Sequence, residues 1–306
     1  MSGKKSAGAL WAMLALLVAG VSGFWFLRDK GGAPPVQSGH ESVASALGVP
    51  RSAGDPITET PVTGTLRYPA YDPAMRQARG PKAYSILRTG PWRGPGEARD
   101  QVLALKPRSD AGDGVASYEI ELVVRACRQL IDGDAEKAWL AMREARMNPD
   151  PHYFERLEIQ LEECAALSAD AGLYEAAWLE RAAEQGSVEA QLLYAIDADT
   201  VLGPAASSAE RAGELQAWRD RSIHYLHALA EGGNVEALSQ LAHVYNMGLQ
   251  AAHDPVAAYA YLKVVSRLRP NAVYGDMLEQ QRRRLNPGQQ QDAAAQAEAI
   301  ERRCCR

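Results

Sequence analysis

Aromatic residues are scarce in this chain of 306 residues, where they make up 7% of the sequence and only three are Phe. The mean hydropathy is -0.29, which argues against a membrane protein with many spans, since each span needs about 20 apolar residues. Catalytic signatures are also missing. The sequence has no GxSxG, no HExxH, no phosphate-loop pattern and no GxGxxG after a strand. We therefore predict a protein that is not an enzyme and has no catalytic residue, cofactor or metal site.

Glycine and proline are concentrated in one part of the chain. Residues 31–114 hold 12 Gly and 11 Pro, whereas the much longer stretch 115–306 holds 10 and 6. Frequent breakers prevent regular helices and strands, and such a segment buries too little apolar surface to offset its ordering entropy. The distribution predicts an anchor over 1–30, a mostly disordered linker over 31–114, and a folded domain over 115–306.

Charge is divided along the same lines. Residues 1–108 carry 14 basic against 7 acidic side chains, and residues 109–306 carry 19 against 31. Binding to nucleic acid depends on cationic side chains that displace phosphate counterions. The acidic charge of the folded part therefore excludes nucleic acid as its partner.

The N-terminus contains one long uncharged run. Residues 6–27 lie between Lys5 and Arg28 without a charged side chain, and 22 residues of helix span about 33 Å. This length matches a bilayer core of about 30 Å and predicts a single transmembrane helix in the inner membrane. The flanking charges favour a cytoplasmic N-terminus and a periplasmic domain. A signal peptide whose cleavage releases the domain into the periplasm is the alternative.

The middle of the linker is basic and contains aromatic residues. Residues 67–108 have nine Lys or Arg against Asp72, Glu97 and Asp100, with three Tyr and Trp92 among them. Three interpretations remain open: plain disorder, contact with an anionic surface such as lipid headgroups, and docking onto the acidic C-terminal half.

The folded part contains an internal repeat. At an offset of 47 residues, Leu179 aligns with Leu226, Gly186 with Gly233, and Ala190 with Ala237. Apolar residues recur at steps of three and four before each glycine, as on one face of a helix. Gly186 and Gly233 suit a helix end in the left-handed conformation, and the Ser187 or Asn234 that follows is a good cap for the next helix. Ala190 and Ala237 are small where two helices approach closely.

Further copies share an aromatic residue followed by Leu. The pairs are Trp139-Leu140, Trp178-Leu179, Tyr225-Leu226 and Tyr261-Leu262. The copy over 222–248 is the most complete, because it ends Leu241-Ala-His-Val-Tyr245-Asn-Met-Gly248. The copy at Trp139 lacks the glycine and has Asn148-Pro149 in its place. One helix pair cannot bury its apolar face alone, so successive pairs must stack.

This pattern resembles the Sel-one-like repeat, a relative of the tetratricopeptide repeat, over residues 134–285. The resemblance implies an all-α fold, an α-solenoid of helix-turn-helix repeats. It also implies a scaffold for protein–protein contacts, often found in bacterial envelopes, and it names no partner. The tail over 280–306 is polar and is expected to form a helix that caps the last repeat.

Four cysteines are present. Cys127 and Cys164 are 37 residues apart, close to one repeat, so they can lie on neighbouring helices and form a disulfide in an oxidising compartment. Such a bond would contribute about 3–4 kcal/mol. Two separate buried thiols are the alternative. Cys304 and Cys305 are adjacent, and a vicinal disulfide, an intermolecular bond and free thiols all remain open.

Histidine is the remaining residue type that could support chemistry. His224, His227, His243 and His253 lie close enough in sequence to suggest a zinc site. No carboxylate is placed to complete such a site, and we interpret them as surface or interface residues. The sequence thus predicts a non-catalytic adaptor for another protein, tethered to the inner membrane through residues 6–27. The alternative is an envelope-associated hydrolase, or a subunit of one, that uses an acidic groove.

Overall fold

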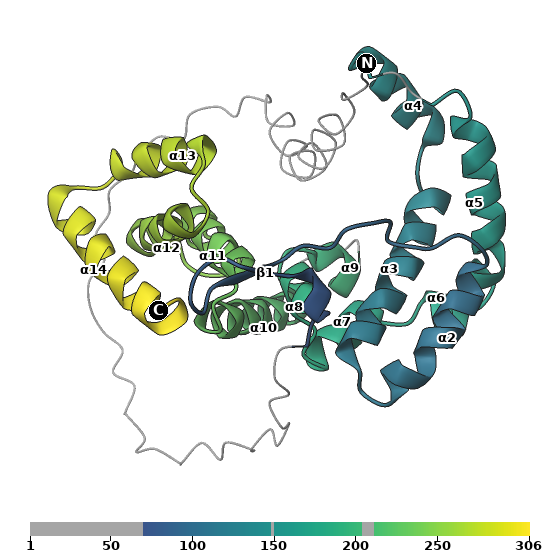
Figure 1. Ribbon diagram of the computed structural model, residues 1–306, viewed down its shortest axis with the longest axis horizontal. Coiled ribbons are helices and arrows are strands. Elements are labelled where there is room, and N and C mark those ends of the chain that lie inside the picture. Colours follow the sequence, from purple (N-terminus) through teal and green to yellow (C-terminus); the bar gives the residue numbers. More distant parts are fainter. Residues whose placement is uncertain (1–69, 148–149, 204–210) are drawn as a thin grey trace, which may run out of the picture. The chain divides into compact units, whose positions relative to one another are not determined.

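The computed structural model describes residues 70–147, 150–203 and 211–306, and these residues are mainly helical (Figure 1). The described part begins with the 3-10 helix η1 (Pro73–Met75) and two antiparallel strands, β1 (Arg76–Ala78) and β2 (Tyr84–Ile86), with Gln77 opposite Ser85. The helices follow: α2 (Ala98–Asp110), α3 (Gly114–Ile131), α4 (Ala135–Glu144), α5 (Tyr153–Ser168), α6 (Ala171–Tyr174), α7 (Trp178–Glu184), α8 (Val188–Tyr194), α9 (Ala198–Leu202), α10 (Ala212–Glu231), α11 (Val235–Met247), α12 (Pro255–Leu268), α13 (Ala272–Arg282) and α14 (Pro287–Cys304).

The predicted anchor over 6–27 and the first part of the linker lie outside the described residues. Among the helices that are described, none has both the length and the hydropathy needed to cross a bilayer.

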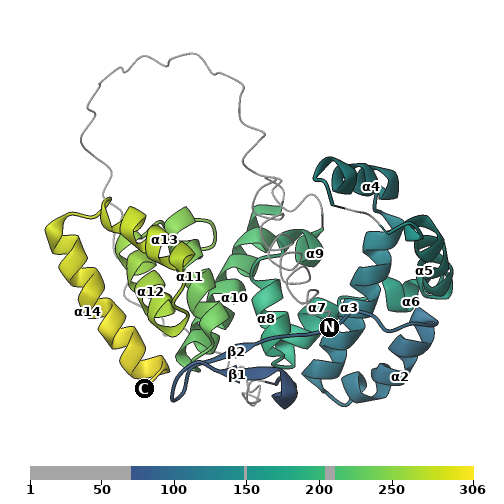
Figure 2. The ribbon, with the colours of Figure 1, turned by 45° about the horizontal axis from the view of Figure 1, so that its top comes forward.

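The helices of the repeat region pack in serial order. α7 packs on α8, α8 on α10, α10 on α11, and α11 on α12, which also contacts α13 and α14. Figure 2 shows α10, α11 and α12 side by side, with α14 against α12. The predicted helical repeats are therefore present, and α14 covers the last of them as expected for a capping helix.

The turns within the repeats have the predicted geometry. Gly186 and Gly233 have φ angles of 87° and 90°, in the region that favours glycine. The Ser187 side chain accepts from the Ala190 amide, and the Asn234 side chain accepts from the Ala237 amide at 2.8 Å. Each helix pair is thus closed by the same left-handed residue and the same kind of cap.

The repeat residues form most of the core. Trp178, Leu179, Leu226, Tyr261 and Leu262 are buried, and Tyr225 is half-buried. The small residues Ala190 and Ala237 are fully buried between helices, as predicted. Gly248 ends α11 with φ of 69°, and the nearby Tyr245 is half-buried against α12.

The copy predicted at Trp139 is different and needs correction. Leu140 is 47% exposed, Trp139 is only half-buried, and α4 has no buried residue. The helix that packs on α7 is α3, not α4. The reason lies in the connection after α4, where Arg146 adopts φ of 55° and α5 begins only at Tyr153, so no tight glycine turn joins the two helices.

The predicted linker also needs correction, because residues 70–114 are folded. They form the β1–β2 hairpin and the 13-residue helix α2, which packs on α3 and α5. Ala98 and Val102 of α2 are fully buried in the cluster that contains Cys127 and Cys164. The folded part of the chain therefore begins at least 45 residues before the predicted boundary at 115.

Candidate binding surfaces

Residues 70–87, which include η1 and the β1–β2 hairpin, contact the turns of two successive repeats, and we call this segment the strap. The Ala70 amide donates to the Gly186 carbonyl at 2.8 Å, and the Val188 amide donates to the Ala70 carbonyl at 3.0 Å. The Tyr84 amide donates to the Gly233 carbonyl at 2.9 Å. Backbone groups at helix ends lack partners within the helix. The two turns, 47 residues apart in the sequence, therefore offer the strap the same backbone partner, a glycine carbonyl group at the end of a helix.

The strap is an integral part of the core at its second contact. Ala83, Tyr84 and Ser85 are all buried. A Cβ atom on Gly233 would lie 2.7 Å from the Lys82 carbonyl oxygen and 2.8 Å from that of Cys304. The close approach of the strap and of the end of α14 thus requires glycine here, in addition to its φ angle. Burial raises the pKa of the Tyr84 hydroxyl to about 12.

Basic side chains that follow the strap make ion pairs with the acidic helical domain. Arg88 donates two bonds of 2.8 Å to Glu189, Arg93 lies 2.5 Å from Glu163, and Arg99 lies 3.2 Å from Asp170. Three interpretations of residues 67–108 were open, and for residues 70–108, the part that the structure describes, it shows docking onto the acidic half. The basic segment and the acidic helical domain of the same chain therefore bind each other.

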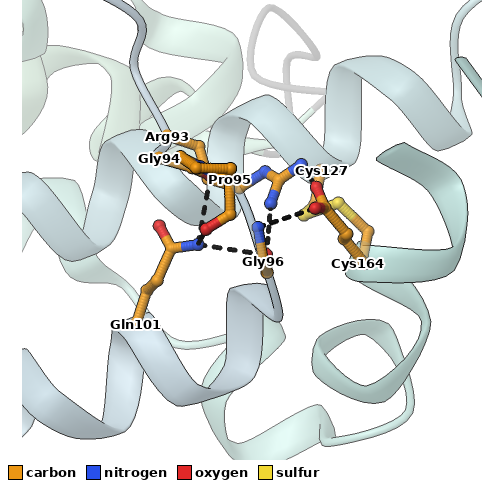
Figure 3. A network of polar contacts seen from close by, with 8 residues as sticks. Arg93, Gly94, Pro95, Gly96, Gln101, Cys127 and Cys164 are labelled. Carbon is orange, nitrogen blue, oxygen red and sulfur yellow. Dashed lines mark hydrogen bonds and ion pairs between the residues drawn. A yellow bond between two sulfur atoms is a disulfide. The ribbon is translucent and has the colours of Figure 1, made fainter. Parts of the chain in front are cut away.

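Figure 3 shows how the loop before α2 is held beside a disulfide. The Gln101 side chain donates to the Gly94 and Gly96 carbonyls at 3.1 Å. The disulfide Cys127–Cys164 joins α3 to α5, with Cα atoms 5.6 Å apart, which confirms the predicted pair. Cys304 and Cys305 form a vicinal disulfide, one of the states that the sequence left open.

Buried charge is concentrated where α9 meets α3. The Glu121 side chain is 1% exposed, and burial raises the pKa of its carboxyl group. Arg125 donates to Glu121 at 3.0 Å and to Asp197 at 2.6 Å. Asp197 also accepts from the Thr200 amide at the start of α9. Both carboxylates accept from Arg125 and so hold α9 on α3, which is a structural role.

The histidines do not form a metal site. Nowhere in the part of the chain that the structure describes do three His, Cys, Asp or Glu gather to hold an ion. His227 instead lies between two tyrosines, with Nε2 3.0 Å from the Tyr245 hydroxyl and Nδ1 3.5 Å from the Tyr261 hydroxyl. The two tyrosine rings are stacked at 5.9 Å. Burial lowers the pKa of His227, so its neutral form is favoured.

A shallow hollow of about 340 Å³ opens beside this cluster. It is lined by His227, Ala230, Glu231, Tyr261, Ile300, Arg303 and Cys304. At the equivalent place in the preceding repeat, Arg221 bonds Glu180 at 2.6 Å and lies 3.3 Å from Glu184. Ala257 stands one repeat after Arg221, and its short side chain cannot reach Glu231. The lining of the hollow therefore contains an acid, Glu231, and a base, Arg303, at the place that Arg221 occupies in the preceding repeat.

The strongest candidate for a binding surface lies on α4 and α5, which we call the α4–α5 face. It has four exposed apolar side chains: Leu140 (47%), Phe154 (47%), Ile159 (50%) and Leu161 (37%). The rings of Trp139 and Phe154 are 5.9 Å apart and connect the two helices. Sequence reasoning missed this surface, because the same apolar spacing was interpreted as a buried repeat.

Comparisons with known proteins include a match to a solved structure. No family model and no curated protein matches the chain. The solved structure of c5321, described as a protective antigen present in uropathogenic Escherichia coli strains and displaying an SLR fold, overlaps 67% of this chain at 16% identity and a TM-score of 0.28. The chain spans about half of that protein, 53% of its length. The helical repeats are shown by the chain's own helices and turns.

Proposed function

We propose that the protein is a non-catalytic scaffold that binds another protein through its helical domain. The observation that carries this proposal is the α4–α5 face, where large apolar side chains stay exposed on two neighbouring helices. Large exposed apolar side chains beside polar ones are typical of protein interfaces, whose centres are apolar and whose rims are polar. α5 is held in place by the buried Cys164 and Leu167 on its other side, so that little ordering entropy of this helix opposes binding.

We further propose that residues 6–27 tether this scaffold to the inner membrane, with the helical domain in the periplasm. The disulfide between Cys127 and Cys164 supports an oxidising compartment, because reducing compartments keep most thiols free. Since the chain is docked on the repeats from Ala70 onward, the proposed tether shortens from 31–114 to 31–69. A shorter tether raises the effective concentration of the domain near the membrane.

The alternative is an envelope hydrolase with an acidic groove. That function needs a carboxyl group free to exchange protons with a substrate. The carboxyl group with the most distinctive environment, Glu121, is buried and bonded to Arg125, which favours the scaffold. Loss of a turnover activity on Glu121→Gln, with folding intact, would support the enzyme instead.

Photo-crosslinking in intact cells tests the proposal. A photoreactive residue replaces Leu140 in one variant and Val273 in the other, a residue of α13 that is 65% exposed. We expect the position of Leu140 to give a defined adduct with one envelope protein that copurifies at fixed stoichiometry, and the position of Val273 to give none. Adducts only with cytoplasmic proteins would overturn the proposed orientation. Absence of any stoichiometric partner at both positions would overturn the scaffold.

A further inference from the structure

The α4–α5 face combines apolar side chains with a row of acids. On α5, Phe154 and Leu161 are seven residues apart, about two helical turns, and so lie on one flank. Ile159 lies about 140° round the helix from Phe154. The carboxylates between these flanks are Glu155, Glu158 and Glu162, and all three are exposed. The opposite side of α5 is occupied, because Cys164 and Leu167 are fully buried.

α4 extends the same surface. None of its residues is buried, and Leu140 is exposed beside the Trp139 that contacts Phe154. The Arg143 guanidinium lies 4.9 Å from the centre of the Trp139 ring. A helix without a buried residue is marginal alone, so a partner that covers α4 would stabilise it.

The charge of the α4–α5 face favours one class of partner over others. Residues 132–162 carry eight acidic side chains against four basic ones. One of the four, Arg156, is already paired with Asp150. Complementary charge steers partners together and excludes those of like charge. The excess of negative charge disfavours nucleic acid and anionic lipid, and it favours a cationic segment.

The backbone of α4 and α5 favours a helical partner over an extended one. Both α4 and α5 satisfy their backbone groups internally, so they offer no edge to an extended strand. An amphipathic helix can pack its side chains into the grooves of α4 and α5, as helices do in bundles. Its apolar residues at i, i+3, i+4 and i+7 would contact Leu140, Phe154 and Leu161.

We propose that the α4–α5 face binds an amphipathic helix of another protein whose apolar stripe is flanked by Lys or Arg. Apolar contacts with Phe154 and Leu161 provide the affinity, and pairing of the flanking cations with Glu158 and Glu162 provides the selectivity. This proposal rests on the scaffold function and adds the class of partner.

The test uses the full-length protein and an 18-residue peptide in which Leu at helical spacing is flanked by Lys, labelled for fluorescence anisotropy. A second peptide has Glu in place of each Lys. We expect the lysine peptide to bind at least tenfold more tightly than the glutamate peptide, and added salt to reduce the difference because exposed charges are screened.

Two pairs of variants localise the binding. Phe154→Ser/Leu161→Ser is expected to weaken binding of the lysine peptide at least tenfold, whereas the control Val273→Ser on α13 changes it less than twofold. Glu158→Lys/Glu162→Lys is expected to abolish the preference for the lysine peptide. The control Asp292→Lys/Glu298→Lys, two exposed acids of α14, is expected to preserve it. The charge variants leave the apolar residues in place, so circular dichroism should show the same helix content.

Each other outcome overturns the proposal. Equal binding of both peptides, or equal losses in the face and control variants, would contradict the assigned partner. Sedimentation that shows a dimer disrupted by Phe154→Ser would assign the face to a second copy of this chain. If crosslinks from the position of Leu140 to an envelope protein persist while Glu158 and Glu162 have no effect on peptide binding, the charge rule fails and the scaffold function stands.

Discussion

The helix pairs α10–α11 and α4–α5 begin from similar sequence patterns and reach opposite states. Each first helix carries an aromatic residue followed by Leu, yet Leu226 is fully buried and Leu140 is 47% exposed. Gly233 follows Tyr225 by eight residues and makes a tight turn, whereas the chain after Trp139 leaves α4 through Arg146 with φ of 55°. The comparison teaches that the apolar stripe specifies a helix, and that the turn decides whether neighbouring helices can bury it.

A second difference is the strap. It bonds to the turns at Gly186 and Gly233 and places Ala83 and Tyr84 in the core. Disulfide Cys127–Cys164 holds α5 on α3, but α4 and the first half of α5 have no such cover. The pairs joined by a tight glycine turn, which we call closed, form the scaffold. We interpret α4–α5, the open pair without such a turn, as the surface available to a partner.

The largest expected effect comes from truncating the equivalent leucines. Leu226→Ala should lower the free energy of unfolding by about 4 kcal/mol, because it removes buried methyl groups and leaves a cavity. Leu140→Ala should change it by less than about 0.5 kcal/mol, as for an exposed position. Urea titration followed by circular dichroism measures both. Equal losses would mean that α4 is packed as the repeats are.

Removal of the disulfide between α3 and α5 should have the next largest effect. Cys127→Ala/Cys164→Ala opens a loop of 37 residues and should lower the free energy of unfolding by about 3–4 kcal/mol. Cys304→Ala/Cys305→Ala opens almost no loop and is the matched control, with a much smaller expected loss. A reversed order in thermal unfolding would show that the C-terminal pair, not the α3–α5 link, stabilises the domain.

Glycine replacement tests the closed turn. Gly233→Ala should cost about 2 kcal/mol, since it combines a positive φ angle with contact between the new Cβ atom and the strap. Gly213→Ala in α10 is the control, because its Cβ would meet nothing within 4 Å, and alanine favours helix. If Gly233→Ala unfolds at the same urea concentration as the native chain, the strap does not lie against this turn.

The smallest expected effect concerns pH. Burial lowers the pKa of His227 below its ordinary value of 6.5, so the folded state binds its proton less readily than the unfolded state. Its contribution to stability is therefore present above pH 6.5 and is lost as pH falls below that value. The urea midpoint of the native protein should drop more between pH 7.5 and 5.5 than that of His227→Gln. Parallel pH dependence in the two proteins would contradict this environment for His227.

The sequence predicted those features that depend on nearby residues. Gly186 and Gly233, each followed by a capping side chain, predicted the turns, and the spacing of Cys127 and Cys164 predicted their disulfide. Docking of this region onto the acidic half was one of three open interpretations, but the place of the strap on the turns could not be predicted, because its contacts with Gly186 and Gly233 are between backbone groups. Helix α2 was missed because Pro107, in its last turn, was counted as a breaker. The exposure of Leu140 could not be predicted, because it depends on whether another helix packs against α4, and the residues of α4 alone do not determine that.

Hydrogen exchange of the full-length protein tests the contrast between closed and open pairs most directly. We predict that amides of the strap over 83–86 and of α11 exchange at one slow rate, since this part of the strap bonds to the turn at Gly233 and opens only with it. Amides of α4 should exchange much faster, through local opening. Fast exchange of the strap beside a protected α11, or protection of α4 equal to that of α11, would contradict the account.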